Sequence, residues 1–207
     1  MTARHPTPPI APGRLRAAWR AAHAPLPGVP RWSTAVAYAI PFAVLPAGLW
    51  RIAAVVFHVV ADGGEHGAGD LPSWLPIEVY VILLSVLSEL IAFTAIGLIA
   101  SWGENVPRWV PLLGGRPVPT SAVVVPAALG AVVLTTLWTA TAISMFSGHT
   151  LQGAPLPDDF PTKALHGWEL AAFYASYAPL LLWGPLLAVL CVAYSRRRAR
   201  VVPTQAG

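Results

Sequence analysis

The chain has 207 residues, of which 56% are hydrophobic and only 11% are charged. Soluble domains carry about 25% charged residues, so the composition excludes an ordinary soluble domain and indicates a protein that lies within a membrane. The net charge of +4 comes from arginines that cluster beside apolar segments, a distribution that suits anionic lipid headgroups better than nucleic acid.

Residues 1–33 are rich in proline and arginine, and we expect a basic cytoplasmic tail here. A short helix over residues 14–22 would place Leu15, Ala18 and Trp19 on one face, as in helices that lie on a membrane surface. A disordered basic tail held near the lipid is the alternative.

Four apolar segments follow, and each is long enough to cross a bilayer, which takes about 20 residues in a helix. Short connections between consecutive helices favour antiparallel neighbours. The sequence therefore predicts an all-α fold, a polytopic membrane protein whose four transmembrane helices form an antiparallel bundle over residues 34–195. The spans are expected at about 34–60, 77–101, 121–147 and 168–194, followed by a basic cytoplasmic tail over 196–207.

The basic residues predict the orientation of the spans. Five arginines precede the first span, two lie between the second and third spans, and four follow the last span, whereas the other two loops share one lysine. Because basic residues accumulate on the cytoplasmic side of a membrane, we expect both termini and the middle loop in the cytoplasm. The expected location is the plasma membrane of a bacterial cell.

Two opposite charges, Arg51 and Glu89, lie deep inside apolar spans. With a rise of about 1.5 Å per residue, Arg51 would lie about 14 Å and Glu89 about 18 Å below the outer surface. These depths let the two long side chains meet, and pairing lowers the desolvation cost of each charge. We therefore expect Arg51 and Glu89 to form an ion pair.

Other polar side chains extend this pair into a polar stripe on each helix, because spacings of four and seven residues repeat on one helix face. We expect these stripes to enclose a ligand pocket that opens outward. The candidate pocket residues are Arg51, His58, Glu78, Ser85, Glu89, Thr135, Trp138, Thr139, Tyr174 and Tyr177. The alternative is a structural ion pair that only fixes the register of two helices.

The loop after the second span alternates tryptophan, proline and charge. Trp102 and Trp109 would lie at the level of the lipid headgroups, and Arg108 would contact lipid phosphates or Glu104. This loop is either a tight interfacial turn or a surface that binds a membrane partner protein.

The same loop reads W-G-E-N-V-P-R-W over residues 102–109. It resembles a stretch in small integral membrane proteins of actinobacteria, which carry a W-G-E-x-x-P-R-W loop before an apolar span. The resemblance covers the second span to the start of the third. It implies a multi-pass membrane protein and no particular chemistry, so no functional residue is carried over.

Catalytic signatures are absent from the sequence, which contains no H-E-x-x-H, G-x-S-x-G or C-x-x-C motif. The single cysteine, Cys191, excludes an internal disulfide and a cysteine-based metal site. The acidic loop over residues 62–70 lacks the order of an EF-hand, and we interpret it as a solvated loop. We predict no metal site, and the sequence indicates no particular cofactor.

Three functions remain open. The one that we favour is binding or transport of a small molecule or ion through the polar pocket, by a single chain, a homo-oligomer or a complex with a partner subunit. The second is a membrane-embedded enzyme for a lipid or isoprenoid, with His58, Glu78 or Glu89 as the acid or base. The third is a non-catalytic scaffold that assembles through the loop after the second span.

Overall fold

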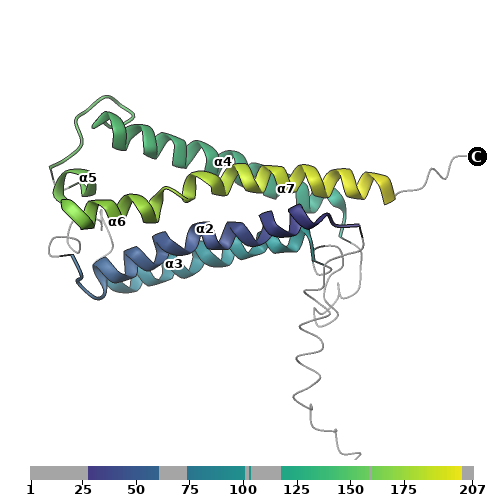
Figure 1. The fold of residues 1–207 in the computed structure, drawn as a ribbon, viewed down its shortest axis with the longest axis horizontal. Coiled ribbons are helices and arrows are strands. Elements are labelled where there is room, and N and C mark those ends of the chain that lie inside the picture. Colours follow the sequence, from purple (N-terminus) through teal and green to yellow (C-terminus); the bar gives the residue numbers. More distant parts are fainter. Residues whose placement is uncertain (1–27, 61–73, 101–102, 104–117, 159, 202–207) are drawn as a thin grey trace, which may run out of the picture.

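Long helices form the body of the protein in the computed structural model (Figure 1). The structure describes residues 28–60, 74–100, 103, 118–158 and 160–201. Their helices are α2 (Arg31–Val55), α3 (Ile77–Thr94), the 3-10 helix η1 (Ala95–Leu98), α4 (Thr120–Ser147), α5 (Pro161–Ala164), α6 (Gly167–Tyr177) and α7 (Leu180–Val201). These described parts contain no strand, so the predicted all-α fold is confirmed.

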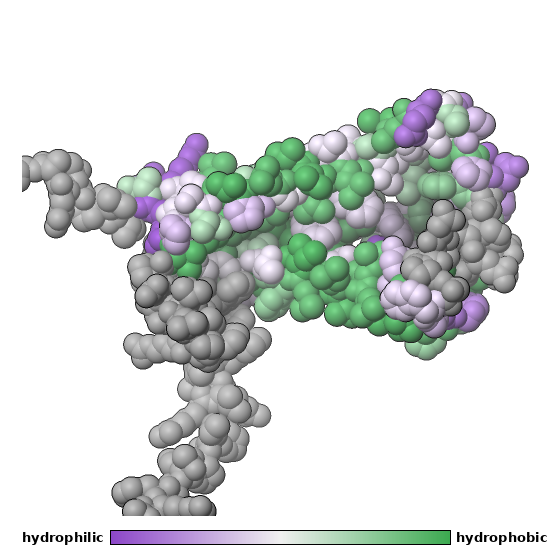
Figure 2. Space-filling model, turned by 180° about the vertical axis from the view of Figure 1, so that it is seen from behind, coloured by the Kyte–Doolittle hydropathy of each residue, from purple (hydrophilic) through white to green (hydrophobic). Residues whose placement is uncertain are grey.

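Four helical segments are long and apolar enough to cross a membrane: Arg31–Val55, Ile77–Leu98, Thr120–Ser147 and Gly167–Arg200. Their outer surfaces carry large apolar side chains, and Phe42 for example is 72% exposed. Figure 2 shows such apolar residues along the length of the molecule and hydrophilic residues near its ends. An exposed apolar surface of this extent suits lipid as the surrounding solvent, and the chain is an integral membrane protein.

The first span ends earlier than predicted, at Val55 instead of residue 60. His58 follows with a φ of +49°, in the left-handed region that a right-handed helix excludes. The valines around it are β-branched and therefore weak helix formers. Hydropathy alone could not reveal this end, because the residues beyond it are as apolar as the helix itself.

The last span differs from the prediction at its middle and at its end. It is divided into α6 and α7 around Pro179, which has no backbone N–H to continue the helical hydrogen bonds. It then continues as helix through Arg200, so the arginines expected in a tail lie on α7. Arginine is a good helix former, and cations are favourable at a helix C-terminus.

The helices pack in the spatial order α3, α2, α7, α4, with α6 also against α2. Small residues allow the close approaches that this packing needs. A Cβ atom added to Gly48 of α2 would lie 3.6 Å from Cβ of Ser85 in α3, so these two backbones run in close contact. Ile40 and Val44 of α2 and Leu190 of α7 belong to the buried cluster at the centre.

Arg198 joins the end of α7 to the start of α4. Its Nε donates a hydrogen bond to Oγ1 of Thr120 at 3.2 Å, and its Nη2 donates one to the carbonyl oxygen of Val118 at 2.8 Å. The start of α2 and the end of α7 also lie at this same end of the molecule (Figure 1). The even number of spans therefore returns the chain to the side from which it started.

Gly184 of α7 has no room for a side chain against α4. An added Cβ would lie 2.6 Å from the backbone nitrogen of Thr135 and 2.8 Å from the carbonyl oxygen of Ala131. We predict that Gly184→Ala lowers the free energy of unfolding by at least ~1–3 kcal/mol, because two helix backbones must separate. Thermal unfolding in detergent measures the effect.

Gly130→Ala is the matched control, because it adds the same methyl group to the same pair of helices. Its Cβ would meet only Cδ2 of Leu187, at 3.9 Å, which is ordinary van der Waals contact. We expect this variant to unfold at or above the temperature of the wild type, since alanine is the better helix former. Equal destabilisation by both substitutions would contradict the packing of α4 on α7.

Candidate functional site

A cavity of about 460 Å³ lies at the end of the molecule opposite the start of α2 and the end of α7. The walls come from α2, α3, α4 and α6, and from the segment around α5. Most of the lining is apolar or aromatic, and Arg51 is the one charged side chain among the described residues that line it. The lining side chains are Trp50, Arg51, Ala54, Val55, Val60, Ile77, Tyr80, Val81, Leu84, Met145, Pro157, Phe160, Pro161, Ala164, Leu165, Phe173 and Tyr177.

Arg51 is half-buried, and its Nε is fully buried without a hydrogen-bond partner among the described residues. The guanidinium group lies close enough to the hydroxyl of Tyr177 to interact with it electrostatically. Tyr177 is held in place by Phe173, with ring centroids 4.6 Å apart, and by Trp138 of α4, at 6.3 Å. The result is a cation beside a phenol, inside a cavity whose other walls are mostly apolar and aromatic.

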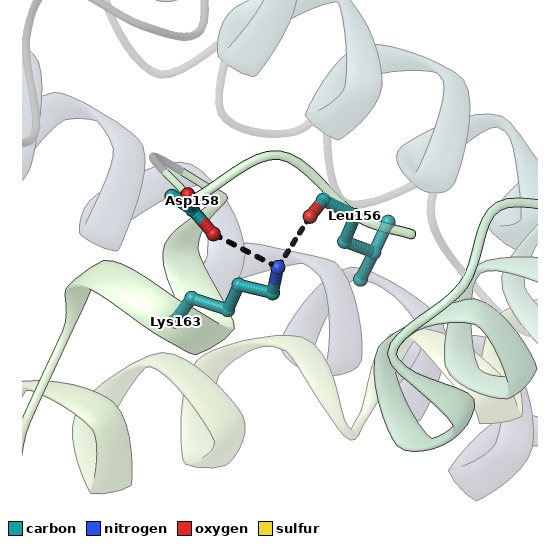
Figure 3. A network of polar contacts seen from close by, with 3 residues as sticks. All are labelled: Leu156, Asp158 and Lys163. Carbon is teal, nitrogen blue, oxygen red and sulfur yellow. Dashed lines mark hydrogen bonds and ion pairs between the residues drawn. The ribbon is translucent and has the colours of Figure 1, made fainter. Parts of the chain in front are cut away.

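The segment beside the cavity is fixed by Lys163, the only lysine in the chain (Figure 3). Its Nζ donates hydrogen bonds to the carbonyl oxygen of Leu156 and, at 3.2 Å, to Oδ1 of Asp158. This is the one ion pair between two residues that the structure describes. It closes the loop that brings Phe160 and Leu165 to the cavity.

The predicted ion pair between Arg51 and Glu89 is wrong. Arg51 faces the cavity, whereas Glu89 is partly exposed on α3 and does not line the cavity. The reason is the position of the helix end. Arg51 lies four residues before the end of α2, about 6 Å along the axis, and Glu89 lies twelve residues into α3, about 18 Å.

The contact of Gly48 with Ser85 gives the same separation independently. Arg51 lies three residues further out than Gly48, and Glu89 lies four residues further in than Ser85. The two antiparallel helices thus place the charged residues about 10 Å apart along the bundle. The structure contains no ion pair between them, since the one ion pair among the described residues joins Lys163 to Asp158.

The other predicted pocket residues on α2 and α3 lie outside the cavity. His58 is exposed beyond the end of α2, and so it does not share a helix face with Arg51. Glu78 lies in the first turn of α3, where an acidic side chain is favourable. Ser85 is 5% exposed and packs against Gly48.

Five of the predicted pocket residues lie on α4 and α6, and of these only Tyr177 lines the cavity. Thr135 donates a hydrogen bond to the carbonyl oxygen of Ala131 in its own helix, and Thr139 is exposed. Trp138 supports Tyr177 from behind. The ring of Tyr174 stacks on Phe146, with centroids 6.2 Å apart.

Most residues of the cavity wall were not predicted from the sequence. Tyr80, Trp50 and Phe173 lay within apolar spans and carried no signal that separates them from lipid-facing residues. The loop between α4 and α6 contains no motif that marks it as part of a site. Its apolar residues, Leu156, Phe160 and Leu165 among them, were the available signal, because a loop fully in water would seldom hold so many.

The interaction loop with Trp102, Glu104, Arg108 and Trp109 lies outside the described residues, as does the acidic loop over 62–70. Where the structure is described, no group of three histidine, cysteine or acidic side chains could hold a metal ion. No protein-family model, curated protein or solved structure matches the chain. The cavity must therefore be interpreted from its own chemistry.

We predict that Arg51→Gln and Glu89→Gln change stability independently. The charges lie too far apart for contact, so the coupling energy in a double-mutant cycle should be about 1 kcal/mol or less. Thermal or denaturant unfolding of the four variants in one detergent provides the measurement. A coupling of ~2–3 kcal/mol, at the upper end of the range for residues in contact, would show that the pair exists.

Proposed function

We propose that this membrane protein binds a small amphipathic anion in the cavity at its outer end. Such a molecule has an apolar body and one acidic group. The aromatic and aliphatic wall would hold the body, and Arg51 would hold the acidic group. This replaces the more polar pocket expected from the sequence, since only Arg51 and Tyr177 of the predicted pocket residues line the cavity.

The observation that carries this proposal is the buried Nε of Arg51, which has no hydrogen-bond partner in the described structure. A charge removed from water is costly unless it is paired and hydrogen-bonded. A guanidinium group presents several donors in a planar fork that matches a carboxylate or a phosphate. An acidic ligand would supply the acceptor that Glu89 does not.

The shape of the cavity also supports a small ligand. Its volume of about 460 Å³ lies within the ~300–1,000 Å³ that is usual for ligand sites, which are mostly apolar with a few placed polar groups. Tyr177 adds a hydroxyl beside Arg51. Lys163 joins Leu156 to Asp158 in the loop beside the cavity.

We propose that the protein lies in the bacterial plasma membrane. The distribution of its arginines supports an orientation with both termini in the cytoplasm. The cavity would then open on the outer side of the membrane. An enzyme that uses His58, Glu78 or Glu89 as acid or base gains no support, because none of the three lines the cavity. The scaffold hypothesis and any oligomer or partner protein stay predictions.

The test compares dodecanoate with dodecanol, which has the same chain length but no anionic group. Native mass spectrometry of the purified protein in mild detergent measures the bound fraction of each probe. We expect the wild type to prefer dodecanoate by about tenfold or more, the value of one charge-assisted hydrogen bond. Arg51→Gln should lose this preference.

Two further variants make the result specific. Arg31→Gln removes the same charge from the exposed start of α2 and should keep the preference for dodecanoate. Ala164→Trp fills the cavity from α5 without changing any charge and should weaken both probes. Equal binding of the two probes by the wild type, or unchanged binding by Arg51→Gln and Ala164→Trp, would contradict the proposal.

A further inference from the structure

A second cavity, of about 430 Å³, lies at the other end of the molecule, where the start of α2 meets the end of α7. Its lining differs from that of the cavity around Arg51, which we call the outer cavity, because it combines an apolar part with several cations. The residues that matter here are Leu98, Ile99, Leu190, Arg196, Arg197 and Arg200. We call it the inner cavity.

The arginines of the inner cavity share one face of α7, since residues at spacings of three and four lie together on a helix. Arg197 is fixed at the cavity wall. Its Nη2 donates a hydrogen bond to the carbonyl oxygen of Leu98 at 3.4 Å, and its guanidinium lies 5.4 Å from the ring centroid of Tyr194. Arg196 and Arg200 are exposed one helical turn apart. Three positive groups therefore converge on one wall.

The N-terminus of α2 forms the opposite wall, through Pro30, Trp32 and Ser33. This helix is 25 residues long and has no side-chain cap. The first turn of a helix presents unpaired N–H groups and the positive end of the helix dipole, and both favour an anion. The arginines of α7 and the positive end of the α2 dipole therefore both contribute positive charge to the inner cavity.

Ser33 gives independent evidence for a ligand. Ser33 lines the inner cavity and is only 2% exposed, yet its buried Oγ has no hydrogen-bond partner in the described structure. Buried hydroxyl groups nearly always have a partner. A ligand oxygen in the cavity would accept a hydrogen bond from this group.

We infer that the inner cavity binds the phosphate group of an anionic phospholipid. A phosphate provides several oxygen acceptors, which suits Arg196, Arg200 and the hydroxyl of Ser33 together. The apolar part, formed by Leu98, Ile99 and Leu190, suits the beginning of an acyl chain. Clusters of basic residues at the cytoplasmic end of a membrane helix commonly attract anionic lipids, and the cavity makes this contact a defined site. The inference does not depend on the outer cavity.

The test titrates delipidated full-length protein in detergent with dioleoylphosphatidylglycerol or dioleoylphosphatidylcholine, followed by native mass spectrometry. We expect the wild type to bind phosphatidylglycerol more tightly. Arg196→Gln should weaken this binding about tenfold, and Ser33→Ala about threefold, as expected for a charged and a neutral hydrogen bond. Arg51→Gln, in the outer cavity, should leave it unchanged.

Two controls separate a defined site from general attraction to a basic surface. Arg31→Gln removes the same charge at the same end of the molecule, and Ser121→Ala removes an exposed hydroxyl from the start of α4. Neither residue lines the inner cavity, so both variants should bind phosphatidylglycerol like the wild type. If Arg31→Gln weakens binding as much as Arg196→Gln, the site is overturned in favour of diffuse attraction.

Inorganic phosphate distinguishes a lipid from a soluble phosphate compound. We expect millimolar phosphate to displace little phosphatidylglycerol, because the acyl chain contributes to binding. Complete displacement, or phosphate binding that depends on Arg196 without any binding of phosphatidylglycerol, would overturn the assignment to a lipid. Normal binding by both Arg196→Gln and Ser33→Ala would overturn the site itself.

Discussion

The close contact between Gly48 of α2 and Ser85 of α3 sets the register of the first two helices. A glycine at this point lets the two backbones approach, and a Cβ there would already be in contact with Ser85. Helices in a membrane gain little from hydrophobic exclusion, so close packing of small residues is a main source of their association. Sliding the helices by one turn would lose this contact.

This register decides what each buried charge can do. It places Arg51 beside Tyr80, Val81 and Leu84 of α3 at the outer cavity and leaves Glu89 further in. Arg51 is therefore available to a ligand instead of being neutralised within the bundle. At the other end, the helices that carry the termini bring the arginines of α7 to the N-terminus of α2. Among the described residues, Arg51 thus lines one cavity, and Arg196, Arg197 and Arg200 line the other.

The number and type of the helices could be predicted from the sequence, because hydropathy over a span of about 20 residues is a strong signal. The end of α2 could not, since Val55, Val56, Val59 and Val60 are as apolar as the span itself. The predicted end of the span was therefore five residues too late, so that Arg51 was expected too deep in the membrane, near the depth of Glu89. Arg51 and Tyr177 were found because polar groups are rare in spans, whereas aromatic wall residues such as Phe173 look the same whether they face lipid or a cavity.

Disulfide cross-linking measures the register most directly, in a Cys191→Ser background that removes the only native cysteine. The variant Gly48→Cys/Ser85→Cys should cross-link readily under mild oxidation, because the two Cβ atoms would lie 3.6 Å apart, within the usual disulfide range. The variant Arg51→Cys/Glu89→Cys should stay reduced. Efficient cross-linking of the second pair, with none of the first, would contradict the register and the assignment of Arg51 to the cavity.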